Sequence, residues 1–139
     1  SMDVNLRGPV FLVQEALPWL KKSPHAAVLN VLTGAAFLFS STISLYAIGK
    51  AGMMAATRAM AAEFEPFGIR VNALSPGTVD TDMVRKNTPE AQDVMTSFQL
   101  MKRKTSPDEM VGPALMLTSD AGSFITGHVV FADGGMVPH

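Results

Sequence analysis

The chain has 139 residues and a mass of 14.8 kDa, which is enough for one domain with a buried core. Hydrophobic residues make up 47% and charged residues 17%, with a mean hydropathy of +0.23, so the composition excludes a disordered chain. The net charge is −1 at pH 7 and no block of basic residues occurs, which argues against binding to nucleic acid or to an anionic membrane surface.

Neither disulfide nor metal chemistry is expected. The chain contains no cysteine, and its three histidines are too scattered for the spacing of metal ligands: His25, His128 and His139. The longest apolar stretch, AAVLNVLTGAAFLF, is interrupted by polar residues and falls short of the ~20 residues that cross a bilayer. No basic region leads into an apolar run at the N-terminus, so no signal peptide is expected. We therefore expect a soluble protein of the cytoplasm.

Hydrophobic periodicity predicts that helices and strands alternate along the chain. A helix over residues 4–21, with a proline straining each end, precedes AAVLNVL, a short apolar run typical of a buried parallel strand. A loop through Gly34 then leads to a long helix, rich in alanine and methionine, from about residue 44 to residue 65. Gly68 is expected to end this helix.

The same alternation continues to the C-terminus. IRVNALS is a second predicted strand, PGTVDT a turn, and residues 83–105 a polar, methionine-containing segment. SPDEMVGPALMLTS has an N-cap serine, a proline at the first helical position and acidic residues in the first turn, which predict a helix. HVVFADGG is the third predicted strand. Three strands separated by helices favour an α/β fold with a parallel sheet and right-handed crossovers.

Polar residues follow the predicted strands at the edge where doubly wound sheets bind ligands. Tyr46, the only tyrosine, and Lys50 begin the helix after the first strand, and their spacing places both side chains on one helix face. Because a nearby ammonium stabilises a phenolate, such a pair is a plausible general acid and base. Taken alone the Tyr-x-x-x-Lys pattern is weak, since any exposed helix can carry it as a solvated pair.

Five motifs occur together in one order: VNLRG, VLNVLTG, YAIGK, GIRVNALSPGTVDT and ITGHVVFADGG. With them the sequence resembles the short-chain dehydrogenase/reductase family, from about Asn5 to Gly135. The resemblance implies that residues 1–139 are a partial domain, the C-terminal portion of a Rossmann-like doubly wound parallel sheet. It also implies an NAD(P)-dependent oxidoreductase that interconverts a ketone and a secondary alcohol, with a 3-oxoacyl thioester reductase as one plausible subtype.

The resemblance assigns roles to four catalytic residues. Tyr46 would donate or accept the proton, while Lys50 would assist it and hold the hydroxyls of the nicotinamide ribose. Thr33 would hydrogen-bond the substrate oxygen. Asn5, in a locally distorted helix, would position a water that links Lys50 to solvent.

The resemblance also assigns the turn after the second strand to the cofactor, NAD or NADP. Residues 76–79 would pack along the nicotinamide, with the backbone of Val79 at the carboxamide and the Thr81 hydroxyl at the carboxamide or phosphate. The implied cofactor-binding residues are Tyr46, Lys50, Pro76, Gly77, Val79 and Thr81, and no metal is implied.

The sequence departs from the family pattern at three places. Threonine stands at position 33 where serine is usual, and its methyl group restricts the rotamer and narrows the pocket. Gly49 stands where serine is also usual, losing a side chain and weakening the helix by about 1 kcal/mol relative to alanine. The glycine-rich turn that binds the pyrophosphate does not occur, so these residues cannot decide between NAD and NADP.

Alternatives remain open at this point. The chain could be a catalytically silent fragment that keeps only an oligomer interface, or it could use the same proton chemistry for epimerisation or dehydration. By resemblance the first two helices would pair with their copies in a homodimer or homotetramer. Three methionines and a phenylalanine lie where the family has a substrate lid, which would suit a partly hydrophobic substrate: Met83, Met95, Phe98 and Met101. The DGG triplet at 133–135 would only end a strand.

Overall fold

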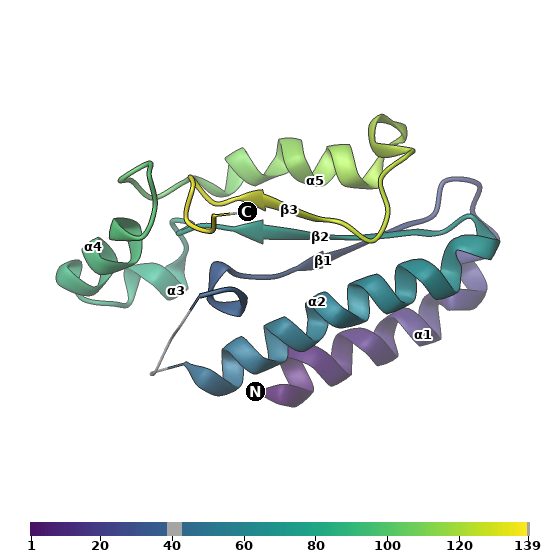
Figure 1. Ribbon diagram of the computed structural model, residues 1–139, viewed down its shortest axis with the longest axis horizontal. Coiled ribbons are helices and arrows are strands. Elements are labelled where there is room, and N and C mark those ends of the chain that lie inside the picture. Colours follow the sequence, from purple (N-terminus) through teal and green to yellow (C-terminus); the bar gives the residue numbers. More distant parts are fainter. Residues whose placement is uncertain (39–42, 139) are drawn as a thin grey trace.

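Three parallel strands form the sheet of this protein in the computed structural model, which describes residues 1–38 and 43–138 (Figure 1). Strand β2 (Arg70–Pro76) lies between β1 (Ala27–Val31) and β3 (Val129–Ala132). The register pairs Ala27 with Arg70 and Ala73 with Val129. The predicted α/β fold with a parallel sheet is confirmed.

Strand β2 is buried along most of its length because helices cover both faces of the sheet (Figure 1). Its side chains alternate, so Val71 and Ala73 join the main hydrophobic core while Asn72 points to the opposite face and bonds the Ile125 carbonyl. The core also contains Met53, Met60, Ala61 and Phe64. A strand buried on both faces is therefore mostly apolar between Arg70 and Pro76, with Asn72 and Ser75 as its buried polar residues.

Two long helices lie side by side on one face of the sheet, and a shorter one covers the other (Figure 1). The first pair is α1 (Gly8–Leu20) and α2 (Ser44–Phe64), and α5 (Val111–Thr118) covers the second face. The Arg70 guanidinium holds the end of α5 by donating to the Leu117 and Ser119 carbonyls at 2.9 and 3.0 Å. Among the described residues, no helix combines the length and hydrophobicity needed to cross a membrane.

The first predicted helix differs from the observed one. Residues Asp3–Arg7 form a π-helical turn, η1, and the α-helix begins only at Gly8. Pro9 is the second residue of α1, directly after the π-helical turn, whereas Pro18 lies inside α1 near its end. The end of α2 at Phe64 agrees to within one residue with the predicted end at about residue 65. The short turn η3 (Glu65–Phe67) follows, and Gly68 then adopts a left-handed φ of 70°.

The second half contains elements that periodicity did not predict. Short helices α3 (Asp82–Arg85) and α4 (Pro89–Ser97) lie largely within residues 83–105, which the sequence predicts only as a polar, methionine-containing segment. The remaining short turns are η2 (Gly34–Ala36), η4 (Pro107–Met110) and η5 (Asp120–Gly122). The third strand is shorter than predicted, because the DGG triplet forms a turn after Ala132.

Two fully buried polar residues of β2 differ in their hydrogen bonding. The Asn72 amide donates to the Ile125 carbonyl at 2.8 Å and accepts from the His128 N–H at 3.0 Å. It thereby joins β2 to the chain that enters β3. The Ser75 hydroxyl, in contrast, has no hydrogen-bond partner among the described residues.

We predict that Asn72→Ala lowers the free energy of unfolding by about 2–3 kcal/mol, because it leaves the His128 N–H without its acceptor, removes one of two donors from the Ile125 carbonyl and opens a cavity. Ser75→Ala serves as the matched control on the same strand and should change stability by less than about 1 kcal/mol. Urea denaturation of both variants tests this. Equal losses for the two substitutions would contradict the assigned role of Asn72.

Candidate active site

Tyr46 and Lys50 lie in the first two turns of α2, near the carboxyl end of β1. The Lys50 ammonium donates to the carbonyl of Val31, the last residue of β1, at 2.7 Å. It lies 5.9 Å from the centroid of the Tyr46 ring. Lys50 therefore reaches the sheet edge, with the Tyr46 ring beside it on the same side of the helix. Lys50 is half-buried, and this burial lowers the pKa of its ammonium.

Thr33 follows β1 directly and caps the short turn η2. Its backbone is extended, with φ −158° and ψ 150°, and its hydroxyl accepts a bond from the Ala35 N–H at 3.4 Å. The hydroxyl proton is not used in that bond, so it can be donated to another oxygen. Both residues are thus attached to the end of β1. Thr33 follows this strand in the chain, and Lys50 donates to the carbonyl of its last residue, Val31.

The C-terminal segment packs beside Thr33. Gly34 is buried, and a Cβ atom at this position would overlap the sulfur of Met136. The buried Asp133 carboxylate holds that segment in place by accepting from the N–H groups of Gly135 and Val137, at 2.9 and 3.0 Å. The DGG triplet therefore does more than end a strand. A buried aspartate in an otherwise apolar run was the signal that could have shown this.

Asn5 approaches α2 from the π-helical turn η1. Its side-chain amide donates to the Ser1 carbonyl at 3.0 Å and not to Lys50. A Cβ atom on Gly49 would lie 3.1 Å from the Asn5 Cβ, so the glycine allows η1 to pack closely on α2. This packing explains why glycine occurs at position 49, where the sequence alone indicates only a loss of helix stability.

The loop after β2 is fixed by backbone contacts. A Cβ atom on Gly77 would lie 2.7 Å from the Asp133 carbonyl oxygen, so only glycine fits between the ends of β2 and β3. Val79 forms a parallel bridge with Thr105. The bridge uses the Thr78 carbonyl and the Asp80 N–H, at 2.9 and 2.8 Å, and leaves the N–H of Val79 outside it.

Gln99 is a buried polar residue that sequence reasoning missed. Its side chain accepts from the Thr78 N–H at 2.7 Å and donates to the Met101 and Arg103 carbonyls at 2.9 and 2.8 Å. It thereby ties the chain after α4 to the loop after β2. No local pattern marks this residue, because its partners lie on a different segment.

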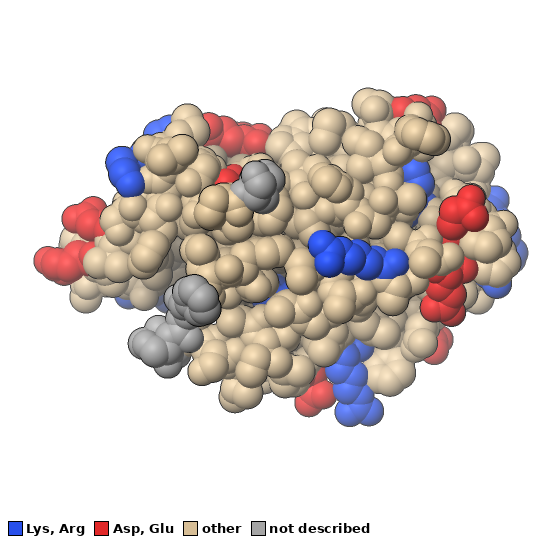
Figure 2. All heavy atoms as spheres, in the orientation of Figure 1, with Lys and Arg blue, Asp and Glu red and all other residues tan. Residues whose placement is uncertain are grey.

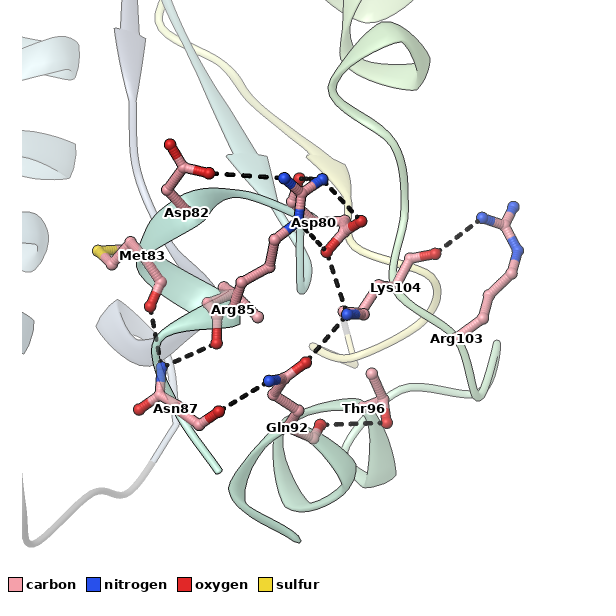
Figure 3. A network of polar contacts seen from close by, with 10 residues as sticks. Asp80, Asp82, Met83, Arg85, Asn87, Gln92, Thr96, Arg103 and Lys104 are labelled. Atoms are coloured by element: carbon pink, nitrogen blue, oxygen red, sulfur yellow. Dashed lines mark hydrogen bonds and ion pairs between the residues drawn. The ribbon is translucent and has the colours of Figure 1, made fainter. Parts of the chain in front are cut away.

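Ionic contacts surround the same loop (Figure 3). Asp80 pairs with Arg85 at 3.0 Å and with Lys104 at 3.0 Å, and these hydrogen bonds lower the pKa of its carboxyl to about 2. Glu109 accepts two bonds from Arg103, at 2.7 and 2.9 Å, and its pKa is also lowered to about 2. Both carboxylates therefore stay charged over the whole physiological range.

A cavity of about 220 Å³ opens where β2 and β3 end. It is lined by Gly77, Gln99, Met101, Arg103, Thr105, Glu109, Met110, Ala132, Asp133 and Gly134. A second hollow of about 380 Å³ lies along β3 and includes Phe37 and Arg58. Neither is lined by Thr33, Tyr46 or Lys50. The structure brings the predicted catalytic side chains to one strand end, but these two hollows do not enclose them.

Charge and metal ligands give little further direction. On the face shown in Figure 2, Lys and Arg side chains are separated from one another and uncharged residues cover most of the surface. The described residues contain no group of three or more His, Cys, Asp and Glu that could hold a metal ion.

Known proteins match almost the whole chain. The family model described as enoyl-(acyl carrier protein) reductase matches residues 1–137. A D-xylose 1-dehydrogenase of Caulobacter vibrioides is 36% identical, over 96% of this chain and 54% of its own length. A 3-oxoacyl-[acyl-carrier-protein] reductase of Thermotoga maritima is 32% identical, over 98% of this chain and 55% of its own length. The chain belongs to the short-chain dehydrogenase/reductase family.

Solved structures of short-chain dehydrogenases share the fold. A gluconate 5-dehydrogenase from Burkholderia cenocepacia, in complex with NADP and tartrate, matches with a TM-score of 0.90 and 29% identity over 97% of this chain and 54% of that one. A 3-oxoacyl-[acyl-carrier protein] reductase from Brucella melitensis with bound NAD matches with a TM-score of 0.87 and 31% identity, over 98% and 50%. The predicted Rossmann-like sheet is confirmed, and the chain spans about half the length of the relatives it matches.

We predict that acid destabilises the protein between about pH 4 and pH 2. The carboxyls of Asp80 and Glu109 have ordinary pKa values of 3.8 and 4.5, which fall to about 2 in the folded chain. Because the folded pKa is the lower one, their stabilisation is present above the unfolded pKa and is lost as the pH falls through the folded pKa.

Urea denaturation as a function of pH measures this effect. Glu109→Gln should remove part of the change in unfolding free energy between pH 4 and pH 2. An unaltered pH dependence in that variant would contradict the assigned contacts of Glu109 with Arg103, Thr105 and Ser106.

Proposed function

We propose that the chain is part of an NAD(P)-dependent oxidoreductase that interconverts a ketone and a secondary alcohol. The observation that carries this proposal is the Lys50 ammonium, which the Val31 carbonyl fixes at the end of β1 with the Tyr46 ring one helical turn away. The names of the xylose and oxoacyl relatives support a dehydrogenase or reductase. We further infer that the chain is the C-terminal half of its Rossmann-like domain and works in the cytoplasm.

Tyr46 is the proposed proton donor in reduction and the proton acceptor in oxidation. The positive charge of Lys50 favours the phenolate that remains when Tyr46 gives up its proton. Thr33 donates its free hydroxyl proton to the substrate oxygen and so orients the reacting group. A half-buried ammonium also acts more strongly on a nearby anion than a fully solvated one, because less water screens it.

Asn5 is proposed to position a water that links Lys50 to solvent. The close contact at Gly49 supports this role, because it brings the π-helical turn against α2 one residue before Lys50. A π-helical turn also disturbs the regular backbone pairing of a helix and is often found at functional sites.

The residues present fit a nicotinamide and its ribose. One Lys50 proton is used by Val31, and the other two can be donated to ribose hydroxyls. Residues 76–79 with Thr81 supply the N–H of Val79 and a half-buried hydroxyl, which suit a carboxamide. When bound, NAD or NADP would supply the hydride chemistry. These residues place it and move the proton.

An apolar portion is proposed for the substrate, as in a 3-oxoacyl thioester. Exposed apolar side chains gather between α3 and the end of the segment that follows α4, including Met83 at 71% and Leu100 at 81% exposure. Val94, Phe98 and Met101 are exposed there too, whereas Met95 is half-buried. A sugar would leave such a surface without an apolar partner.

Self-association is proposed through α1 and α2, in a homodimer or a homotetramer. Both helices leave apolar side chains in solvent, namely Val4 in the turn before α1, Leu12 and Trp19 on α1, and Leu45 and Ile48 on α2. Burying them against a symmetry-related copy would remove apolar area from water. A silent fragment that keeps only this interface is the competing proposal, and the half-length match to relatives favours it.

We predict that Tyr46→Phe in the full-length protein lowers the rate of ketone reduction by about 10²–10⁴-fold, because it removes the transferred proton and keeps the ring. Ser44→Ala is the control, since it removes an exposed hydroxyl from the same helical turn. The assay follows oxidation of NADPH and NADH with a 3-oxoacyl thioester as substrate. Retained turnover in Tyr46→Phe would remove Tyr46 from the mechanism.

Cofactor binding separates the enzyme from the silent fragment. A thermal shift with NADH or NADPH is expected for an oxidoreductase, because a ligand that binds only the folded state raises its stability. Absence of any shift at millimolar dinucleotide would favour the fragment.

A further inference from the structure

Residues 81–103, which we call the α3–α4 segment, leave and rejoin the fold at neighbouring points. The bridge between Val79 and Thr105 joins the two ends, with hydrogen bonds of 2.8 and 2.9 Å. Beyond this bridge the segment extends past the carboxyl end of β2 (Figure 1). Its position therefore depends on contacts close to the two ends.

Asp80 is the centre of those contacts (Figure 3). One carboxylate accepts from the Arg85 guanidinium through both oxygens, at 3.1 and 3.0 Å, and pairs with the Lys104 ammonium at 3.0 Å. Arg85 belongs to α3 and Lys104 to the returning chain. Asp80 itself lies between Val79 and Thr81, two residues proposed to contact the cofactor.

Lys104 extends the network to α4. Its ammonium also donates to the Gln92 side chain at 2.9 Å, and Gln92 in turn donates to the Asn87 carbonyl at 2.8 Å. The Asn87 amide bonds the Met83 and Val84 carbonyls, at 3.0 and 3.1 Å, and so completes the end of α3. Both short helices are therefore connected to one carboxylate.

This attachment matters because the two helices have little apolar packing of their own. Within them only Val84 is buried. The side chains of Asp80 and Lys104 are 34% and 33% exposed, so their contact is partly shielded from water and stronger than a fully solvated pair. Polar contacts therefore provide much of the attachment of α3 and α4 to the fold, which apolar packing would otherwise provide.

We propose that Asp80 and Lys104 are positioning residues that fix the α3–α4 segment to the Val79–Thr81 loop. The loop that contacts the cofactor and the apolar side chains that cover the substrate then move as one unit. The roles of loop and cover rest on the proposed function, whereas the attachment itself rests on the contacts. Disturbing Lys104, which touches neither ligand, should therefore weaken the binding of both.

Hydrogen–deuterium exchange of the full-length protein tests the attachment. We expect Lys104→Met and Asp80→Asn to speed exchange in residues 81–97 by about three- to tenfold, because local opening becomes easier. Lys86→Met and Asp93→Asn are matched controls, since both residues are exposed and neither side chain forms a hydrogen bond or an ion pair with a described residue. Lys104→Arg should restore slow exchange, because it keeps the charge.

Binding and kinetics test the coupling. Lys104→Met is expected to raise the Kd for NADH or NADPH and the KM for a 3-oxoacyl thioester by about three- to tenfold, with kcat changed less than about twofold. If Lys104 only supported the fold, its substitution would lower the amount of active protein, and hence the apparent kcat. The dinucleotide Kd and the thioester KM would then stay unchanged.

Two outcomes would overturn the proposal. One is exchange in the Lys104 and Asp80 variants no faster than in their controls, and the other is faster exchange with an unchanged dinucleotide Kd. If the unmodified protein binds neither NADH nor NADPH, the proposed function fails, and the exchange comparison alone then decides whether Asp80 and Lys104 hold the segment.

Discussion

The burial of β2 on both faces is the constraint on which the rest of this structure depends. Because helices cover both sides, most side chains of the strand are apolar, and its long polar side chains need hydrogen-bond partners. Asn72 meets this demand through the chain that enters β3, and Arg70 through the end of α5. The parallel arrangement also brings the carboxyl ends of all three strands to one edge, where Gly77 lets the ends of β2 and β3 meet.

That edge concentrates polar groups of two kinds. At the end of β1, Lys50 is held by a backbone carbonyl and Thr33 by its own turn, which leaves donors available for a ligand. At the ends of β2 and β3, Gln99 and Asp133 use their side chains in holding loops together. The first group keeps hydrogen-bond donors that can bind a ligand, whereas the second group stabilises the loops. Their separation explains why the cavity at the ends of β2 and β3 is lined by supporting residues.

The end of β1 has two further features that bear on the proposed site. In the described residues β1 is an edge strand, and Val31 is half exposed although its carbonyl is used by Lys50. The side chains proposed for catalysis, Thr33, Tyr46 and Lys50, line neither of the two hollows.

The sequence by itself determined the order of helices and strands, the parallel sheet and the pairing of Tyr46 with Lys50, because periodicity and an i, i+4 spacing are local properties of the chain. Hydrophobic periodicity did not predict α3 and α4, because both helices are short and only Val84 in them is buried. Their contacts with the fold include the ion pair of Asp80 and Lys104, which are 24 residues apart in the sequence. Only the tertiary structure explains the glycine at position 49, because the turn η1 packs closely against it. Contacts between residues far apart in sequence depend on how segments dock, and no local pattern encodes that.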